Sequence, residues 1–229
     1  PRLLMKQLWS SSGKGLRRLD GNFEVPLQNW CARSIQLHGG VVVEPRYERI
    51  MDFAMEFIAE KQGVSFCGYS VFLTSDTGKY AGNIIDSEEN LERSILKQYG
   101  ESDNSILQCI KELLIELFSA SIAPFYQGPF GVDMMLVRTS EGLVKIHPCV
   151  EINLRFNMGQ LATKLSSRLL LSGKRGVFRI EYFANPKMLQ DRYLLLSSLP
   201  GFQLLVPVHQ HSCYLAYILM DSETCEEGI

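Results

Sequence analysis

The alternation of apolar and polar residues along the chain predicts a mixture of strands and helices. Segments 51–59 and 64–74 have the period-two pattern of strands, and Lys61-Gln62-Gly63 between them predicts a hairpin turn. Apolar residues recur at helical spacing from Ile106 to Phe118 and from Met158 to Leu169, which predicts two helices with one buried face each.

Turn and capping residues give the other predicted elements their limits. Ser87 caps a helix over 88–99 that Gly100 ends, and Asp103 caps the helix that follows. Further helices are predicted over 28–38 and 187–198. Strands are predicted over 2–8, 41–43, 131–138, 143–154, 176–183, 202–208 and 213–220. Strands and helices do not alternate in strict βαβ order, so the expected fold class is α+β with mostly antiparallel sheets.

Composition excludes several classes of protein. The chain has 229 residues, 46% of them hydrophobic and 21% charged, which is typical of a globular protein with a substantial core. A net charge of −2 gives no basic surface for nucleic acid, so we expect no such partner. No apolar run approaches the ~18 residues of a membrane span, so we expect no membrane-spanning segment.

The sequence begins at Pro1 on what reads as a strand, which suggests a start inside a larger protein. No feature indicates an oligomeric state.

Six scattered cysteines form no C-x-x-C pair. Such cysteines are typical of small buried apolar side chains in a reducing cytosol, so we expect a cytoplasmic protein without a disulfide framework or zinc site. His209 and His211 could chelate a metal from one strand face, but no acid or cysteine lies nearby in the sequence.

Polar residues in the segment 151–156 share one side of a predicted strand. Alternate side chains of a strand face the same way, which groups Glu151, Asn153 and Arg155. The turn at 139–142 pairs this strand with the strand of Asp133, which should lie opposite residue 148 or 149, with Glu151 diagonal at about 7–8 Å. Two carboxylates and an amide oxygen suit Mg²⁺. A solvated polar strand face is the alternative.

Two further segments carry weaker signals. Lys6 precedes the run Ser10-Ser11-Ser12-Gly13-Lys14-Gly15, whose small residues would let backbone N–H groups approach a phosphate, although a plain Ser/Gly turn has the same composition. The run Val43-Glu44-Pro45-Arg46-Tyr47 ends an apolar strand and could face an adenine ring, or be an ordinary strand end.

In order and spacing, these segments resemble those of the ATP-grasp superfamily. The lysine strand and Ser/Gly loop resemble its phosphate-covering loop, Val43-Glu44-Pro45 its adenine hinge, and the strand that begins at Asp52 its ribose-contacting strand. Gly131-Val132-Asp133 and Glu151-Ile152-Asn153 resemble its metal-binding strands. The resemblance runs from about residue 2 to 160. It implies two lobes with a nucleotide cleft between them, residues 1–45 from the first lobe and 46–229 from the second with a C-terminal extension.

The resemblance also implies a role for each matching residue. Lys6 would contact the α and β phosphates of ATP, and the backbone of 10–15 would cover the β and γ phosphates. Asp52 would bind the ribose hydroxyls. Arg155 would steady the transferring phosphate, which makes Lys6 and Arg155 the catalytic residues. The adenine pocket would comprise Val43, Glu44, Arg46 and Tyr47, and the Mg²⁺ ligands, for which Mn²⁺ can substitute, would be Asp133, Glu151 and Asn153.

The implied activity is an ATP- and Mg²⁺-dependent ligase, which activates a small-molecule or peptide carboxylate as an acyl-phosphate for attack by an amine or thiol. The alternatives are a nucleotide-binding module without ligation, and a phosphotransferase on the same fold. Two departures matter. The family's usual N-terminal domain is absent from this sequence, so the chain alone is expected to be weakly active or inactive. Gly131 also stands where some family ligases carry an arginine.

Overall fold

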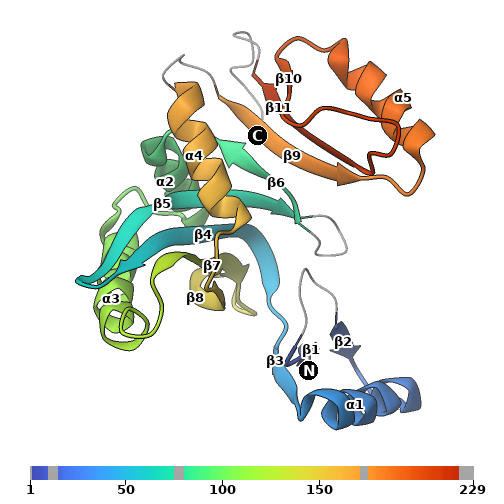
Figure 1. The fold of residues 1–229 in the computed structure, drawn as a ribbon. Coiled ribbons are helices and arrows are strands. Elements are labelled where there is room, and N and C mark those ends of the chain that lie inside the picture. Colours follow the sequence, from blue (N-terminus) through green and yellow to red (C-terminus); the bar gives the residue numbers. More distant parts are fainter. Residues whose placement is uncertain (1, 10–14, 75–79, 171–174, 222–229) are drawn as a thin grey trace.

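The computed structural model describes residues 2–9, 15–74, 80–170 and 175–221. Its N-terminal part is a small antiparallel sheet in the order β2-β1-β3, formed by β1 (Arg2–Gln7), β2 (Leu16–Asp20) and β3 (Val41–Pro45). Helix α1 (Val25–His38) lies beside this sheet, and Met5 and Leu19 are buried there. Figure 1 shows the small sheet set apart from the rest of the fold, joined to it by the chain from β3 to β4.

The rest of the chain is organised around an eight-stranded sheet in the order β10-β11-β9-β6-β5-β4-β7-β8, with every neighbouring pair antiparallel. The neighbouring strands β5 and β4 form the predicted hairpin. The strands are β4 (Glu48–Glu60), β5 (Gly63–Thr74), β6 (Tyr80–Ile85), β7 (Gly128–Arg138), β8 (Val144–Asn153), β9 (Gly176–Tyr182), β10 (Phe202–Leu204) and β11 (Tyr214–Met220).

Helices cover both faces of this sheet (Figure 1). Helices α2 (Glu88–Tyr99) and α3 (Ser105–Ser121) pack on one face, over the largest core cluster. Helix α4 (Met158–Leu170) lies on the opposite face, over β5 and β6. Helix α5 (Pro186–Ser197) packs against β10 and β11. The α+β class with antiparallel sheets is therefore confirmed.

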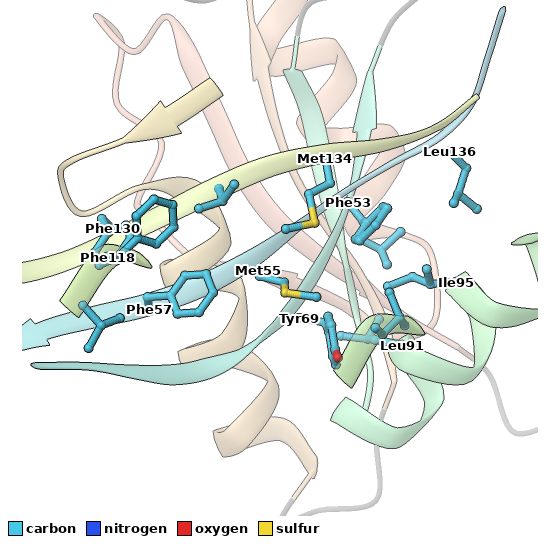
Figure 2. Close-up of a cluster of buried hydrophobic side chains, with 14 of the residues drawn as sticks. Phe53, Met55, Phe57, Tyr69, Leu91, Ile95, Phe118, Phe130, Met134 and Leu136 are labelled. Carbon is cyan, nitrogen blue, oxygen red and sulfur yellow. The ribbon is translucent and has the colours of Figure 1, made fainter. Parts of the chain in front are cut away.

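The main core follows from strand alternation. Phe53, Met55 and Phe57 of β4 are fully buried against α2 and α3, as Figure 2 shows for the cluster around them. Phe57 stacks on Phe130 of β7 with ring centroids 5.4 Å apart, and Phe118 of α3 meets Phe130 edge-on at 5.5 Å. Burial of such side chains contributes about 2 kcal/mol each. The alternate residues of β4 and β7 face α4 instead.

Several sequence expectations need correction. Strands β2 and β6 were not expected, and β10 is shorter than the predicted 202–208. Helix α3 begins after Asn104, and Asp103 only accepts a hydrogen bond from the Ser105 N–H. The expected burial of the cysteines is wrong: of the five described, all free thiols, four are exposed and Cys31 is partly buried.

Candidate functional site

A polar pocket of about 330 Å³ lies on the α4 face of the large sheet. Strands β4 to β8 and the first turn of α4 build it, and none of the described residues of the small sheet lines it. One side is acidic and contains Arg155, whereas the other is formed by β5 and β6. Its lining residues are Glu56, Ser70, Phe72, Thr74, Tyr80, Asn83, Asp133, Glu151, Asn153, Arg155, Asn157, Met158 and Gly159.

Strand pairing brings the predicted metal ligands together. Asp133 of β7 lies directly opposite Glu151 of β8, and Gly131 lies opposite Asn153. The expected diagonal placement of Glu151 is wrong because the pairing contains a bulge: residues 148–150 of β8 face only Met134 of β7. The bulge moves Glu151 into the position that regular pairing would give to Cys149.

Hydrogen bonds link Arg155 to this acidic pair. Arg155 donates from Nη2 to the Asn153 side-chain oxygen at 3.0 Å, and Asn153 donates from Nδ2 to Asp133 Oδ2 at 3.0 Å. Burial, followed by the charge of Glu151, raises the pKa of Asp133 to about 6. Two facing carboxylates whose charges are not neutralised favour a bound cation.

The donor set fits Mg²⁺ with one rearrangement. Asp133 and Glu151 supply carboxylate oxygens from facing positions, as a hard cation prefers. Asn153 turns its NH₂ group toward Asp133, so its amide must turn over to offer an oxygen. Within the described ranges, no three residues of the types His, Cys, Asp and Glu are grouped to hold a metal, so the site would combine two carboxylates with an amide.

Glu56 is a site residue that the sequence analysis did not single out. Its side chain is buried beneath the pocket, where Oε1 accepts a hydrogen bond from Ser70 Oγ at 3.0 Å and Oε2 accepts one from Asn157 Nδ2 at 2.9 Å. Burial raises the pKa of this carboxyl to about 7, although both hydrogen bonds act to lower it. The signal in the sequence was a single acid between apolar residues of a strand, at the spacing of Asp52 rather than of the core residues.

Two glycines make room for Glu56. A Cβ on Gly159 would lie 1.8 Å from Glu56 Oε1, and one on Gly131 would lie 2.5 Å from Glu56 Oε2 and 2.3 Å from Asn157 Nδ2. Neither glycine has a positive φ, so space rather than backbone conformation requires the missing side chain. This packing is the physical reason why an arginine at position 131 would not fit here.

Neutral hydrogen-bonding groups form the other side of the pocket. Asn83 is fully buried, donates to the Val71 carbonyl at 3.3 Å and accepts from the Tyr80 hydroxyl. Burial raises the pKa of Tyr80, so it remains a hydroxyl. These residues escaped the sequence analysis because no periodic pattern of apolar and polar residues marks β6, although Asp76-Thr77-Gly78 before it has the composition of a turn.

Asp52 lies on the same strand as Glu56, an even number of residues away and therefore on the same face. Its carboxylate accepts hydrogen bonds from Arg49 Nη1 at 2.8 Å and Thr74 Oγ1 at 2.9 Å. Burial raises its pKa, and the Arg49 charge opposes that shift. The predicted ribose ligand Asp52 is thus already hydrogen-bonded to Thr74 of β5.

Other predicted nucleotide ligands belong to the small sheet and its connection to β4. Lys6 forms an ion pair with Glu44 (2.5 Å), and Arg46 pairs with Asp20 (2.6 Å). Tyr47 meets His147 of β8 edge-on with centroids 5.6 Å apart, which places the predicted hinge against the large sheet. Val43 is more than half exposed.

The predicted phosphate loop is described only at its ends. Ser10, Ser11, Ser12, Gly13 and Lys14 lie outside the described residues. Gly15 has a φ of 73°, and its carbonyl accepts a hydrogen bond from the Gln7 N–H at 3.1 Å, which brings the loop ends together. His209 and His211 are exposed, far along the sequence from the pocket residues.

Three solved structures illustrate what this fold is similar to. N5-carboxyaminoimidazole synthetase from Staphylococcus aureus complexed with ADP matches with a TM-score of 0.60 and 10% identity, over 97% of this chain and 58% of that chain. Carboxyaminoimidazole ribonucleotide synthase from Aspergillus clavatus complexed with ATP gives 0.55 and 14%, over 95% and 56%. Biotin carboxylase from Campylobacter jejuni, in a complex with an ATP compound, gives 0.53 and 10%, over 96% and 54%.

The chain therefore spans little more than half the length of the structures it matches. No protein-family profile and no curated protein sequence matches it. In the part of the chain that the structure describes, every helix is too short or too polar to cross a membrane.

Proposed function

We propose that this chain, which has the ATP-grasp fold, is the nucleotide-binding part of an ATP- and Mg²⁺-dependent ligase that activates a carboxylate. One observation carries the proposal: Asp133, Glu151 and Asn153 come from two paired strands, and together with Arg155, which follows the end of β8, they line one pocket. The similar structures, two of them solved with ADP or ATP, support nucleotide as the ligand of this fold. Residues 1–45 would belong to one lobe and 46–229 to the other.

In this proposal the chain's own residues position and neutralise the reacting groups. Lys6 would leave Glu44 for the α and β phosphates, and Arg155 would hold the γ-phosphate beside the substrate carboxylate. Asp133 and Glu151 would hold Mg²⁺, which supplies charge neutralisation at the phosphates when bound. The carboxylate oxygen attacks the γ-phosphorus, ADP leaves, and an amine or thiol then displaces phosphate from the acyl-phosphate. Such catalysis depends mainly on positioning and electrostatic stabilisation.

Thermal unfolding with each ligand alone and with both together tests the metal–nucleotide site. We expect ATP and Mg²⁺ together to raise the melting temperature by more than the sum of their separate effects, because each neutralises the other's charge. Glu151→Gln should abolish the magnesium-dependent part, whereas Glu141→Gln, in the exposed turn before β8, should not. A wild-type shift that is the same with and without magnesium would contradict the proposal.

Product analysis separates the ligase from the other activities of the same fold. A ligase releases ADP and phosphate and forms a new acyl bond, whereas a phosphotransferase leaves the phosphate on its acceptor. A module that only binds nucleotide gives neither product, although it would still show the thermal shift.

A further inference from the structure

We propose that Glu56 and Asn157 form a clamp beneath the pocket that fixes the segment 153–157, and thereby hold Arg155 in its working position. Both would be positioning residues that act through Arg155. This inference rests on the proposed function, because Arg155 matters only if phosphate binds beside it.

Asn157 connects Glu56 to the start of α4. Its Nδ2 donates to Glu56 Oε2 at 2.9 Å, while its Oδ1 accepts the backbone N–H of Gln160 at 2.8 Å. The second bond is an N-cap, which satisfies one of the free N–H groups at the helix start. Asn157 therefore uses both ends of its amide, one on β4 and one on α4.

Gln160 fastens the same helix turn to the sheet. Its buried Nε2 donates to the carbonyl of Phe57 on β4 at 3.0 Å and to that of Phe130 on β7 at 3.3 Å. The start of α4 is thus fixed to two strands by hydrogen bonds that do not pass through Asn157, although the Gln160 side chain also interacts with Glu56. Loss of the Glu56–Asn157 bond should therefore loosen the preceding segment while the helix stays docked.

The other end of the segment is fixed at Asp133. Asn153 donates to Asp133 and accepts from Arg155, and the Arg155 N–H donates to the Asn153 carbonyl at 2.8 Å. Arg155 thus lies between two anchored asparagines, on a short link from strand to helix. Its own side chain is exposed, so the anchors rather than packing restrict where it can go.

Burial argues that Glu56 acts indirectly. Its side chain is only 1% exposed, enclosed by Ser70, Asn157 and the two glycines that leave no room for a Cβ. Glu56 contributes to the floor of the pocket, but a carboxylate so enclosed has little access to a ligand; it accepts one hydrogen bond from β5 and one from the segment before α4. At a pH above 7, where Glu56 is ionised, these hydrogen bonds are made to a charged group and are stronger than neutral ones, which suits a clamp.

A pair of substitutions that exchanges the hydrogen-bond donor and acceptor between positions 56 and 157 tests the clamp. At a pH well above 7, where Glu56 is ionised, Asn157→Asp places a second carboxylate against Glu56 Oε2 and keeps a good N-cap, so it breaks the clamp selectively. Glu56→Gln alone can keep the bond, because its amide oxygen can face Asn157 while its NH₂ faces the Ser70 hydroxyl. In the double variant the new amide at position 56 donates to the new carboxylate at position 157, and the net charge is that of the wild type.

The first readout is the preference for Mg·ATP over Mg·ADP, measured as a ratio of dissociation constants by calorimetry. We expect Arg155→Ala to reduce this ratio, and Asn157→Asp to reduce it by about tenfold, the cost of a lost hydrogen bond to a charged group. Glu56→Gln should change it by less than about threefold, and the double variant should recover to a similar level. Asn157→Asp added to Arg155→Ala should lower it no further, because the clamp acts through Arg155.

The second readout is hydrogen–deuterium exchange of residues 153–160 in the ligand-free protein. Exchange should speed up in Asn157→Asp and return to the wild-type rate in the double variant. The inference is overturned if Asn157→Asp leaves both readouts unchanged, or if the double variant is as impaired as Asn157→Asp. If the wild type binds neither nucleotide, the proposed function fails, whereas the clamp itself still stands or falls with the exchange data.

Discussion

The charged side chains of the small sheet and those in the pocket of the large sheet differ in burial and in pairing. Among the described residues of the small sheet and its connection to β4, each predicted ligand that carries a charge already has a partner of opposite sign: Lys6 with Glu44, and Arg46 with Asp20, all partly open to solvent. In the pocket, Glu56 is buried and Asp133 partly buried, and neither forms an ion pair with any described residue. Burial raises the pKa of each, to about 7 and about 6.

This difference indicates which charged residues stabilise the fold at little cost and which are retained at a cost in stability. Solvated ion pairs contribute little to stability and can open at little cost, so the small sheet can release Lys6 to a ligand. Unpaired carboxylates removed from water are costly, and such perturbed groups gather at functional sites. In the proposed site, the pocket would therefore be the half whose geometry is fixed before the ligand binds.

The largest effect is expected from filling the space beside Glu56. Gly159→Ala would put a Cβ 1.8 Å from Glu56 Oε1, and it should destabilise the fold by about 3 kcal/mol because the enclosed carboxylate cannot move aside. Chemical denaturation measures the change. Ser167→Ala, on an exposed position of the same helix, is the control and should change stability by less than about 0.5 kcal/mol. Equal stability of both variants would mean that the pocket floor is pliable.

The next effect concerns pH. The pKa of Glu56 is raised from 4.5 to about 7 in the folded protein, so between these values the folded state keeps a proton that the unfolded state releases. The stabilising contribution is therefore fully present below pH 4.5 and is lost as the pH rises through 7.

Between pH 5 and 8, the wild type should lose about 2 kcal/mol more of its unfolding free energy than Glu56→Gln, which cannot titrate. Urea unfolding at several pH values measures the difference. If the unfolding free energies of the two proteins change in parallel with pH, the pKa of Glu56 is not raised by folding. The contrast in charge burial between the pocket and the small sheet would then be contradicted.

The smallest effect belongs to the small sheet. A double-mutant cycle on Arg46→Ala and Asp20→Ala should give a coupling energy below about 1 kcal/mol, because the pair is partly exposed. Adding salt should reduce it further. A coupling above about 2 kcal/mol would place this pair among the structurally fixed charges and weaken the comparison.

The sequence predicted those parts of the fold whose signals are local. The β4–β5 hairpin and the limits of α2 followed from alternation, a turn and two capping residues. Strands β2 and β6 were missed because Leu-Arg-Arg-Leu-Asp and Tyr-Ala-Gly-Asn are poor strand sequences, which become strands by pairing with β1, and with β5 and β9.

The same distinction holds for the site. The shared face of Glu151 and Asn153 follows from strand periodicity, and their partner Asp133 from a hairpin turn. Arg155 lies beyond the end of β8, so the prediction that it shares this strand face is wrong, and it reaches the pocket from the link to α4. Glu56 could not be recognised in that way, because its hydrogen-bond partner Asn157 is far along the chain, brought near only by the docking of α4. The requirement for glycine at positions 131 and 159 could not be predicted either, because it arises from the same tertiary contacts with Glu56 and Asn157.

The bulge in β8 has a consequence for how the site could vary among related chains. Side chains alternate with a period of two, so removing an even number of residues from 148–150 would restore regular pairing and still leave Glu151 facing Asp133. Removing an odd number would turn Glu151 to the opposite face. The number of residues between Asp133 and Glu151 can therefore change by two without separating the two carboxylates. A sequence search that requires a fixed spacing would miss related chains in which the acidic pair is intact.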